Sequence, residues 1–150
     1  MKVVIQRVKH AEVVVNGKRE GSISEGLMIL AGFVPADTTE DFQWMAKKIL
    51  GLRIFNDEHG VMNHAVLEKN GEILLVSQFT LHASTKKGNR PSYIRAAKPD
   101  VAKKMYLQFQ EVLEQEFGKK IQTGVFGADM KVTLLNDGPV TIIIDTEHKE

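Results

Sequence analysis

The sequence predicts an α/β fold in which mixed, mainly antiparallel β-sheets form a barrel-like core covered by two main helices. Three observations support this fold class. Most apolar segments are short and rich in β-branched residues, and only two segments repeat apolar residues at helical spacing. No low-complexity stretch, internal repeat or linker divides the 150 residues, so we expect residues 1–150 to form a single domain.

The N-terminal part of the chain predicts a β-hairpin followed by a buried strand. Residues 3–8 and 11–15 are rich in valine and predict two strands, and residues 18–23 would form the return strand. Asn16-Gly17 stands between them and is typical of a two-residue turn, because both turn positions require a positive φ. The continuous apolar run 27–34 is too short for a helix and predicts a buried strand.

Two later segments predict helices. Thr38, followed by Asp41 three residues on, resembles a capping box at a helix start. A second helix should begin near Pro99, a residue favoured at the first helical position, and end at Gly118. The expected apolar faces are Phe42, Met45, Ala46, Ile49 and Leu50 in the first helix, and Val101, Met105, Phe109, Val112 and Leu113 in the second.

The remaining apolar segments predict strands. Residues 53–55 should form a short strand, and residues 72–81, with the sequence EILLVSQFTL, a long one. Residues 131–135 and 140–145 are expected to form two final strands, separated by the turn-forming residues 136–139.

Composition excludes several classes of function. The chain has no cysteine, which rules out disulfides, thiolate catalysis and zinc sites built on cysteine. Its five histidines are scattered without an HxH or HExxH pairing, so we expect no metal and no cofactor. GxSxG, P-loop and GxGxxG motifs are also missing. There is no secretory leader and no apolar run of about 18 residues, so we expect a cytoplasmic location without membrane association.

The first candidate for a functional site is the segment Ser77-Gln78-Phe79-Thr80. Because side chains alternate along a strand, Gln78 and Thr80 would project from one face, and Ser77 and Phe79 from the other. Gln78 and Thr80 could together orient the polar groups of a substrate. The alternative is structural, since threonine suits strands and glutamine commonly faces solvent.

The second candidate is Gly138-Pro139, which lies between two strand-like runs, where proline is unusual. A plain hairpin turn explains Asn136-Asp137-Gly138-Pro139 equally simply, and cis bonds before proline are uncommon.

The third candidate is a basic tract at residues 84–104, which holds seven Lys or Arg side chains against the single acidic Asp100. Such clusters bind phosphates, although a solvated loop is an equal alternative. The net charge of the whole chain is only +1 and does not by itself predict a nucleic-acid partner.

Taken together, several segments resemble the D-aminoacyl-tRNA deacylase family across essentially the whole chain. SQFTL and NDGPVT form the family's signature in content and spacing. The matching segments are VIQRV (4–8), KILGLRIF (48–55), VSQFTL (76–81), KGNRPSY (87–93), TGVFGADM (123–130) and NDGPVT (136–141). Departures are His82-Ala83-Ser84, where many relatives carry an aromatic and an acidic residue, Asn89 in place of a frequent Arg, and Tyr93 in place of the usual Phe.

The resemblance implies a hydrolase that splits D-aminoacyl-tRNA into D-amino acid and tRNA, and so proofreads chirality in translation. It also implies a homodimer with active sites at the interface, in which a cis Gly138-Pro139 peptide enters the partner's pocket. Its carbonyls would hold the α-amino group and leave no space for an L side chain. Glycine has no side chain to exclude, so glycyl-tRNA should also be cleaved.

The resemblance also assigns roles to single residues. Thr80, Gln78 and Ser77 form the catalytic set, with Ser77 and Gln78 at the pocket floor. Catalysis would come either from attack by Thr80 or from assistance by the tRNA 2′-hydroxyl, which we favour because no base is evident for Thr80. The expected substrate-binding residues are Gly138, Pro139, Phe79, Phe126 and Arg7, and the expected phosphate contacts are Lys86, Lys87 and Arg90.

Phe79 and Phe126 are expected to pack around the terminal adenosine or the pocket wall, and Arg7 to anchor the partner's Gly-Pro loop through backbone carbonyls. Two other interpretations are a nucleic-acid-binding protein without catalysis and an esterase acting on small D-amino acid esters.

Overall fold

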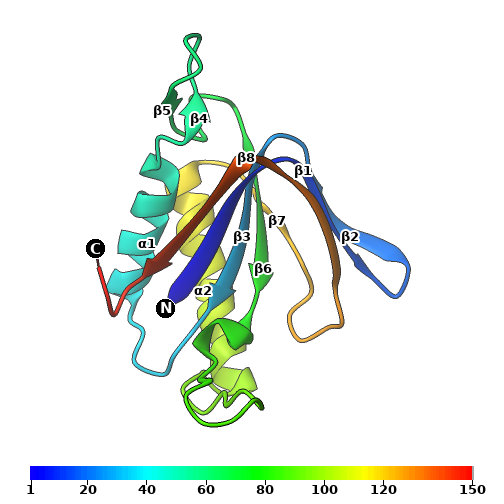
Figure 1. The fold of residues 1–150 in the computed structure, drawn as a ribbon, viewed down its shortest axis with the longest axis vertical. Coiled ribbons are helices and arrows are strands. Elements are labelled where there is room, and N and C mark those ends of the chain that lie inside the picture. Colours follow the sequence, from blue (N-terminus) through cyan, green and yellow to red (C-terminus); the bar gives the residue numbers. More distant parts are fainter. Residues whose placement is uncertain (150) are drawn as a thin grey trace.

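The computed structural model describes residues 1–149. Its main sheet has six strands in the order β2-β1-β3-β6-β7, and β8 pairs with the other edge of β1. The strands are β1 (Lys2–Val15), β2 (Lys18–Ile23), β3 (Gly26–Gly32), β6 (Glu72–Ser77), β7 (Gln122–Thr123) and β8 (Lys131–Asp145). Pairings of β3 with β6 and of β6 with β7 are parallel, and the others are antiparallel. The sheet curls until it is nearly closed into a barrel (Figure 1).

Two long helices, α1 (Thr39–Gly51) and α2 (Pro99–Phe117), cover one face of this sheet (Figure 1). The main core lies between them and the strands, and a smaller apolar cluster fills the opposite, concave side of the bent sheet. The expected fold class is therefore confirmed. Neither helix is long and apolar enough to span a membrane within the described residues 1–149.

Local sequence determines where both helices start and stop. The Thr38 hydroxyl accepts the amide of Asp41 at 3.3 Å, and the Asp41 carboxylate accepts the amide of Thr38 at 3.0 Å. This is the predicted capping box. Pro99 opens α2 as predicted, and Gly118 ends it with a φ of 76°, a left-handed conformation that suits glycine.

The expected apolar face of α1 is buried as predicted, whereas that of α2 is partly wrong. Val101 is exposed, and Met105 and Val112 are only partly buried. Relative to the orientation expected from periodicity, α2 is rotated about its axis so that Tyr106 faces the core. There the Tyr106 hydroxyl donates to the Leu75 carbonyl at 2.9 Å. The buried side chains of α2 are Ala102, Tyr106, Phe109, Leu113 and Phe117.

The two predicted C-terminal strands are one strand, so the expectation of two strands and the alternative of a plain hairpin turn are both wrong. Both halves of β8 run antiparallel to β1, which is long enough to pair with each in turn. The register jumps from Gln6–Thr141 to Val8–Asn136, so residues 137–140 are outside the ladder and form a corner. Figure 1 shows β8 turning at the top of the sheet.

Of four other strand predictions, one is confirmed and three need correction. The two strands expected at 3–8 and 11–15 are the single strand β1, and β8 pairs with both halves of it. Asn16 and Gly17 have φ values of 49° and 75°, which confirms the predicted hairpin turn. The strand expected at 72–81 ends at Ser77, and residues Phe79–His82 form the short 3₁₀ helix η1. Only Phe55 of the expected strand 53–55 is in β4 (Phe55–Asn56), which pairs with β5 (Met62–His64) in a separate hairpin.

Candidate active site

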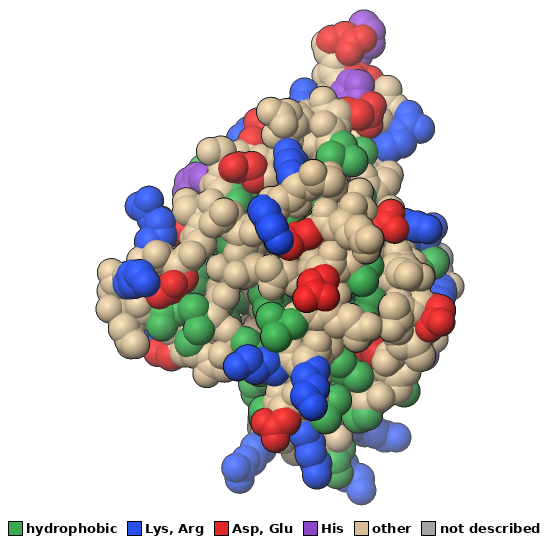
Figure 2. All heavy atoms as spheres, turned by 180° about the vertical axis from the view of Figure 1, so that it is seen from behind, with side chains coloured by type: hydrophobic (Ala, Val, Ile, Leu, Met, Phe, Trp, Pro, Cys, Tyr) green, Lys and Arg blue, Asp and Glu red, His purple; other side chains and the backbone are tan. Residues whose placement is uncertain are grey.

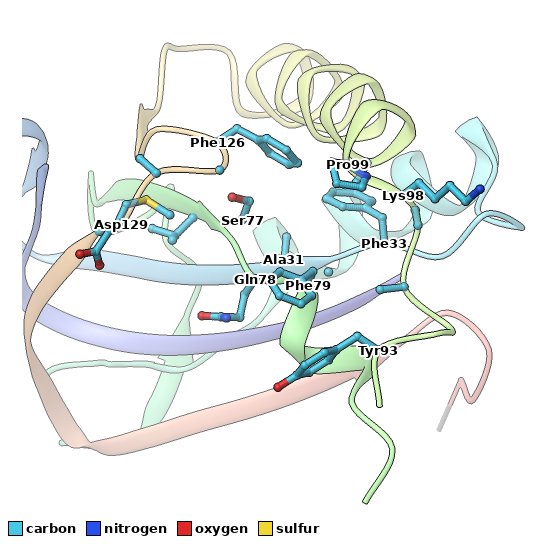
Figure 3. Close-up of a pocket in the computed structure, with 18 of the residues that line it drawn as sticks. Ala31, Phe33, Ser77, Gln78, Phe79, Tyr93, Lys98, Pro99, Phe126 and Asp129 are labelled. Carbon is cyan, nitrogen blue, oxygen red and sulfur yellow. The ribbon is translucent and has the colours of Figure 1, made fainter. Parts of the chain in front are cut away.

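A cavity of about 690 Å³ lies at the carboxyl ends of β3 and β6, which pair side by side through Ala31 and Ser77. Ligands commonly bind at such parallel strand ends. Figure 3 shows Ser77, Gln78 and Phe79 on one side of this cavity, with Phe126 facing them from the segment before β8. The cavity thus joins the segments SQF (77–79) and FGADM (126–130), which are distant in sequence.

The chain changes direction at Gln78, beside the cavity, and two backbone amides after this point are left without an acceptor in the part of the chain that the structure describes. The amide of Gln78 makes the last bond to β3, donating to the Ala31 carbonyl at 2.7 Å. Within residues 1–149, the next two amides, of Phe79 and Thr80, donate to no backbone or side-chain acceptor. These two N–H groups can therefore donate to an oxygen of a bound molecule.

The strand-alternation argument for Gln78 and Thr80 fails, because the strand has already ended at Ser77. The two side chains meet for a different reason. In the first turn of η1, the side-chain amide of Gln78 donates a hydrogen bond from Nε2 to the Thr80 hydroxyl oxygen. Ser77 and Gln78 border the cavity, whereas Thr80 is outside its lining.

Aromatic rings form much of the cavity rim and wall. Phe79 is 54% exposed, and its ring meets that of Tyr93 edge to face, with ring centroids 5.0 Å apart. Deeper in the wall, Phe126 lies 5.8 Å from the ring of Tyr106. Burial raises the pKa of the Tyr106 phenol above its ordinary value, so that this group stays neutral and acts as a donor. The wall is thus apolar, and the Phe126 ring packs on a tyrosine whose hydroxyl is bound to the backbone of β6.

Gly138 and Pro139 lie away from this cavity in the same chain and do not line it. Their peptide bond is cis, Gly138 has a φ of 124°, and both residues are exposed. Arg7 holds the corner of its own chain, whereas a contact with the partner's corner was expected: its Nε donates to the Asp137 carbonyl at 3.1 Å and lies 3.3 Å from the Asp137 carboxylate. The guanidinium is buried, with the residue only 6% exposed.

The basic tract is exposed in the loop between η1 and α2 and on the first turns of α2. Lys and Arg side chains gather at the lower end of the molecule in Figure 2, the end at which this loop lies in Figure 1. Lys86, Lys87 and Arg90 are exposed but do not line the cavity, whereas Lys98 does. Arg95 is paired with Glu147 at 2.6 Å.

Sequence reasoning missed several residues that border the cavity, namely Phe33, Tyr93, Lys98, Asp129 and Met130. Tyr93 and Met130 stand in segments that match the family, which was the available signal. Figure 3 places Asp129 and Lys98 on opposite sides of the cavity. His82, a departure from the family, is 6% exposed, and its Nε2 has no hydrogen-bond partner in the described part of the chain. Within residues 1–149, no three His, Asp or Glu side chains gather as a metal site requires.

A family model described as D-Tyr-tRNA(Tyr) deacylase matches residues 4–145. The chain belongs to the D-aminoacyl-tRNA deacylase family. It is 60% identical to the D-aminoacyl-tRNA deacylase of Parabacteroides distasonis and 62% identical to that of Phocaeicola vulgatus, in each case over 150 residues and 100% of both chains.

Two solved structures share the fold of this chain. A structure described as c-Myc DNA Unwinding Element Binding Protein superposes with a TM-score of 0.92 at 41% identity, covering 97% of this chain and 99% of that one. A probable eukaryotic D-amino acid tRNA deacylase has a TM-score of 0.82 at 18% identity, covering 95% and 97%, and shows the shared fold. The expected family and enzyme class, a hydrolase, are therefore confirmed.

Proposed function

We propose that this chain, acting as one domain in the cytoplasm, hydrolyses the ester of D-aminoacyl-tRNA to free D-amino acid and tRNA. The observation that carries the proposal is the cavity at the ends of β3 and β6, whose lining includes residues of two segments that match the deacylase family, VSQFTL and TGVFGADM. Its volume of about 690 Å³ falls among small-molecule sites, which span about 300–1,000 Å³. The terminal aminoacyl-adenosine is the part of a charged tRNA that such a cavity can hold.

The cavity wall suits a nucleobase. Phe126 presents an aromatic ring in the interior, and Phe79 with Tyr93 forms an aromatic pair at the rim. Bases bind proteins by stacking on aromatic rings. The terminal adenosine would pack between these rings, with Ser77 and Gln78 beneath the ester.

Selection of the D configuration would come from a second copy of the chain. The corner Gly138-Pro139 is exposed and does not reach the cavity of its own chain, so we propose that it enters the cavity of a partner. There its carbonyls would hold the α-amino group and exclude an L side chain by steric conflict. This account needs no pocket shaped to each D side chain, and it lets glycyl-tRNA react.

An open apolar row on the sheet supports the homodimer. Val4 pairs directly with Leu30 on one side and with Ile143 on the other, so the three side chains share one face. This face is turned away from α1 and α2, because the adjacent Val3 and Ile5 are buried in the helix-covered core. Ile143 is 66% exposed, as expected of a surface that a partner covers.

The chemical step would rely on the substrate's own 2′-hydroxyl. Thr80 has Gln78 as its side-chain partner, and an unassisted threonine hydroxyl is a weak nucleophile. The amides of Phe79 and Thr80 would instead stabilise the oxyanion that develops on the ester carbonyl. Lys86, Lys87 and Arg90 would contact tRNA phosphates and add a salt-dependent part of the affinity.

One comparison of substrates tests this function. Purified protein is incubated with D-tyrosyl-tRNA, L-tyrosyl-tRNA, glycyl-tRNA and D-tyrosine methyl ester, and amino acid release is followed. We expect release from D-tyrosyl-tRNA, slower release from glycyl-tRNA, and almost none from the other two.

Each alternative function has its own outcome in this comparison. Binding of charged and uncharged tRNA or of DNA without any release would favour a nucleic-acid-binding protein, and DNA binding is the activity for which one similar solved protein is named. Rapid release from the methyl ester would favour a general esterase. An untouched glycyl-tRNA beside rapid cleavage of D-tyrosyl-tRNA would contradict steric exclusion.

A further inference from the structure

We infer that Asn56, in the hairpin β4–β5, is a positioning residue for substrate selection, acting through Arg7 on the Gly138 corner. The inference rests on the proposed function, since it concerns how the corner that distinguishes D from L substrates is held. Asn56 belongs to none of the segments that border the cavity.

Arg7 connects the hairpin β4–β5 with the corner of β8. Toward β8 its Nε donates to the Asp137 carbonyl at 3.1 Å. Toward the hairpin its Nη1 donates to the Ile54 carbonyl at 2.6 Å and to Asn56 Oδ1 at 3.2 Å. One buried guanidinium thus takes its orientation from both sides.

The third nitrogen of Arg7 lies against the corner itself. A Cβ placed on Gly138 would come within 2.7 Å of Nη2, which leaves no room between the guanidinium and the glycine. Because the guanidinium is planar and rigid, any rotation of it after loss of the Asn56 contact would move Nη2 against Gly138. The position of the corner therefore depends on the hairpin.

The hairpin is suited to hold Asn56 in place. Asn56 pairs with Met62 across the two-stranded sheet, and the amide of Asp57 donates to the Val61 carbonyl at 2.8 Å. The Asp57 carboxylate accepts the amides of His59 and Val61 at 2.9 and 3.0 Å and so closes the loop. These bonds hold the Asp57 pKa below its ordinary value, so the loop is intact at neutral pH.

Three variants test the inference. Asn56→Ala removes one of the three acceptors of Arg7, Asn56→Asp keeps an oxygen at that position, and Asn63→Ala is the matched control. Asn63 belongs to the same hairpin, where it binds Arg53 and Asp57 but not Arg7. For each variant, kcat and KM are measured with D-tyrosyl-tRNA, L-tyrosyl-tRNA and glycyl-tRNA, together with Tm.

We expect Asn56→Ala to lower the D-to-L ratio of kcat/KM about three- to tenfold, while Tm changes little. Asn56→Asp should restore most of that ratio, and Asn63→Ala should leave it unchanged. If Asn56 had only a structural role, Asn56→Ala would lower kcat/KM for all three substrates in parallel. The D-to-L ratio would then stay unchanged.

The inference is wrong if Asn56→Ala keeps the wild-type ratio, or if Asn63→Ala lowers it equally. Either result would leave the proposed function standing, provided that the wild-type protein cleaves D-tyrosyl-tRNA. Failure of the wild-type protein to release D-tyrosine would instead remove the proposed function itself, so the two failures are distinguishable.

Discussion

Gln78 donates a hydrogen bond from its side-chain amide to the hydroxyl oxygen of Thr80, two residues further along the chain. An amide donor cannot take a proton from this hydroxyl, so the contact orients Thr80 without activating it. In the described residues, no carboxylate or imidazole hydrogen-bonds the same hydroxyl. The Gln78–Thr80 contact therefore bears directly on whether Thr80 attacks the ester or the tRNA 2′-hydroxyl assists the reaction.

Thr80→Ala should retain kcat/KM for D-tyrosyl-tRNA within about tenfold of wild type, since the amides of Phe79 and Thr80 stay in place. Substrate with a 2′-deoxy terminal adenosine should react more than about a hundredfold slower, because the assisting group is missing. Single-turnover rates with both substrates check this. Inactive Thr80→Ala beside normal cleavage of the deoxy substrate would reverse the assignment.

Gly138→Ala should abolish most activity and lower the free energy of unfolding by about 1–3 kcal/mol, because a φ of 124° strains any other residue and the new Cβ meets Arg7. Urea unfolding and deacylation kinetics measure the two effects. Gly17→Ala is the control: Gly17 also has a positive φ of 75°, but no atom lies within 4 Å of its added Cβ. It should lose some stability and keep full activity.

Lys98→Ala should raise KM for charged tRNA about three- to tenfold and reduce the slope of log affinity against log salt by about one. The reason is position: Lys98 borders the cavity, where the phosphate nearest the terminal adenosine would lie. Lys69→Ala removes the same charge from the turn before β6, outside the cavity lining, and should change neither value. Equal effects of the two variants would mean that Lys98 makes no specific phosphate contact and that its charge only attracts tRNA in a general way.

Tyr106→Phe should lower the free energy of unfolding by about 1–1.5 kcal/mol at neutral pH, through loss of the hydrogen bond to the Leu75 carbonyl. Burial raises the folded-state pKa of Tyr106 above its unfolded value. The protonated phenol thus contributes stability that is complete below about pH 10 and is lost as pH rises further. Urea unfolding at pH 8, 9.5 and 11 should show a steeper alkaline loss in wild type than in the variant.

Ile143→Lys should convert the proposed dimer into a monomer and remove activity, because it places a charge in the apolar row of Leu30, Val4 and Ile143. Light scattering after gel filtration measures the mass. Leu107→Lys makes the same change at a 47% exposed residue on α2 and should leave mass and activity unchanged. An active monomer of Ile143→Lys would exclude a site completed by a partner.

Local chemistry made much of the fold predictable. Helix ends follow from short-range bonds, such as the box of Thr38 and Asp41 and the left-handed Gly118, which act over three or four residues. Periodicity failed for α2, because the burial of Tyr106 depends on an acceptor 31 residues away, Leu75, that no local pattern reveals. It failed again at residues 136–139. These turn-forming residues lie within the single strand β8, whose two halves, before and after the corner, both pair with β1.

The candidate site was less accessible to sequence reasoning. Nothing in the composition of SQFTL shows that the strand ends at Ser77, because that ending is fixed by the bond from Gln78 to Ala31 in the neighbouring strand. Phe126 and Gln78 line the same cavity because the tertiary fold brings them together. From the sequence alone, only the family resemblance indicated that their two segments belong to one site. Lys98 was one cation among seven until its place at the cavity distinguished it.

The course of β8 has a consequence for the proposed pair of subunits. This strand starts directly after Met130, which borders a cavity, and carries Gly138 at its bend. In a two-fold pair, each copy would furnish the wall of its own reaction centre and the selecting element of its neighbour's. A copy damaged at the bend would silence only the neighbour's centre, and a copy damaged at the wall only its own. Two differently damaged copies joined in one pair would therefore leave one centre whole.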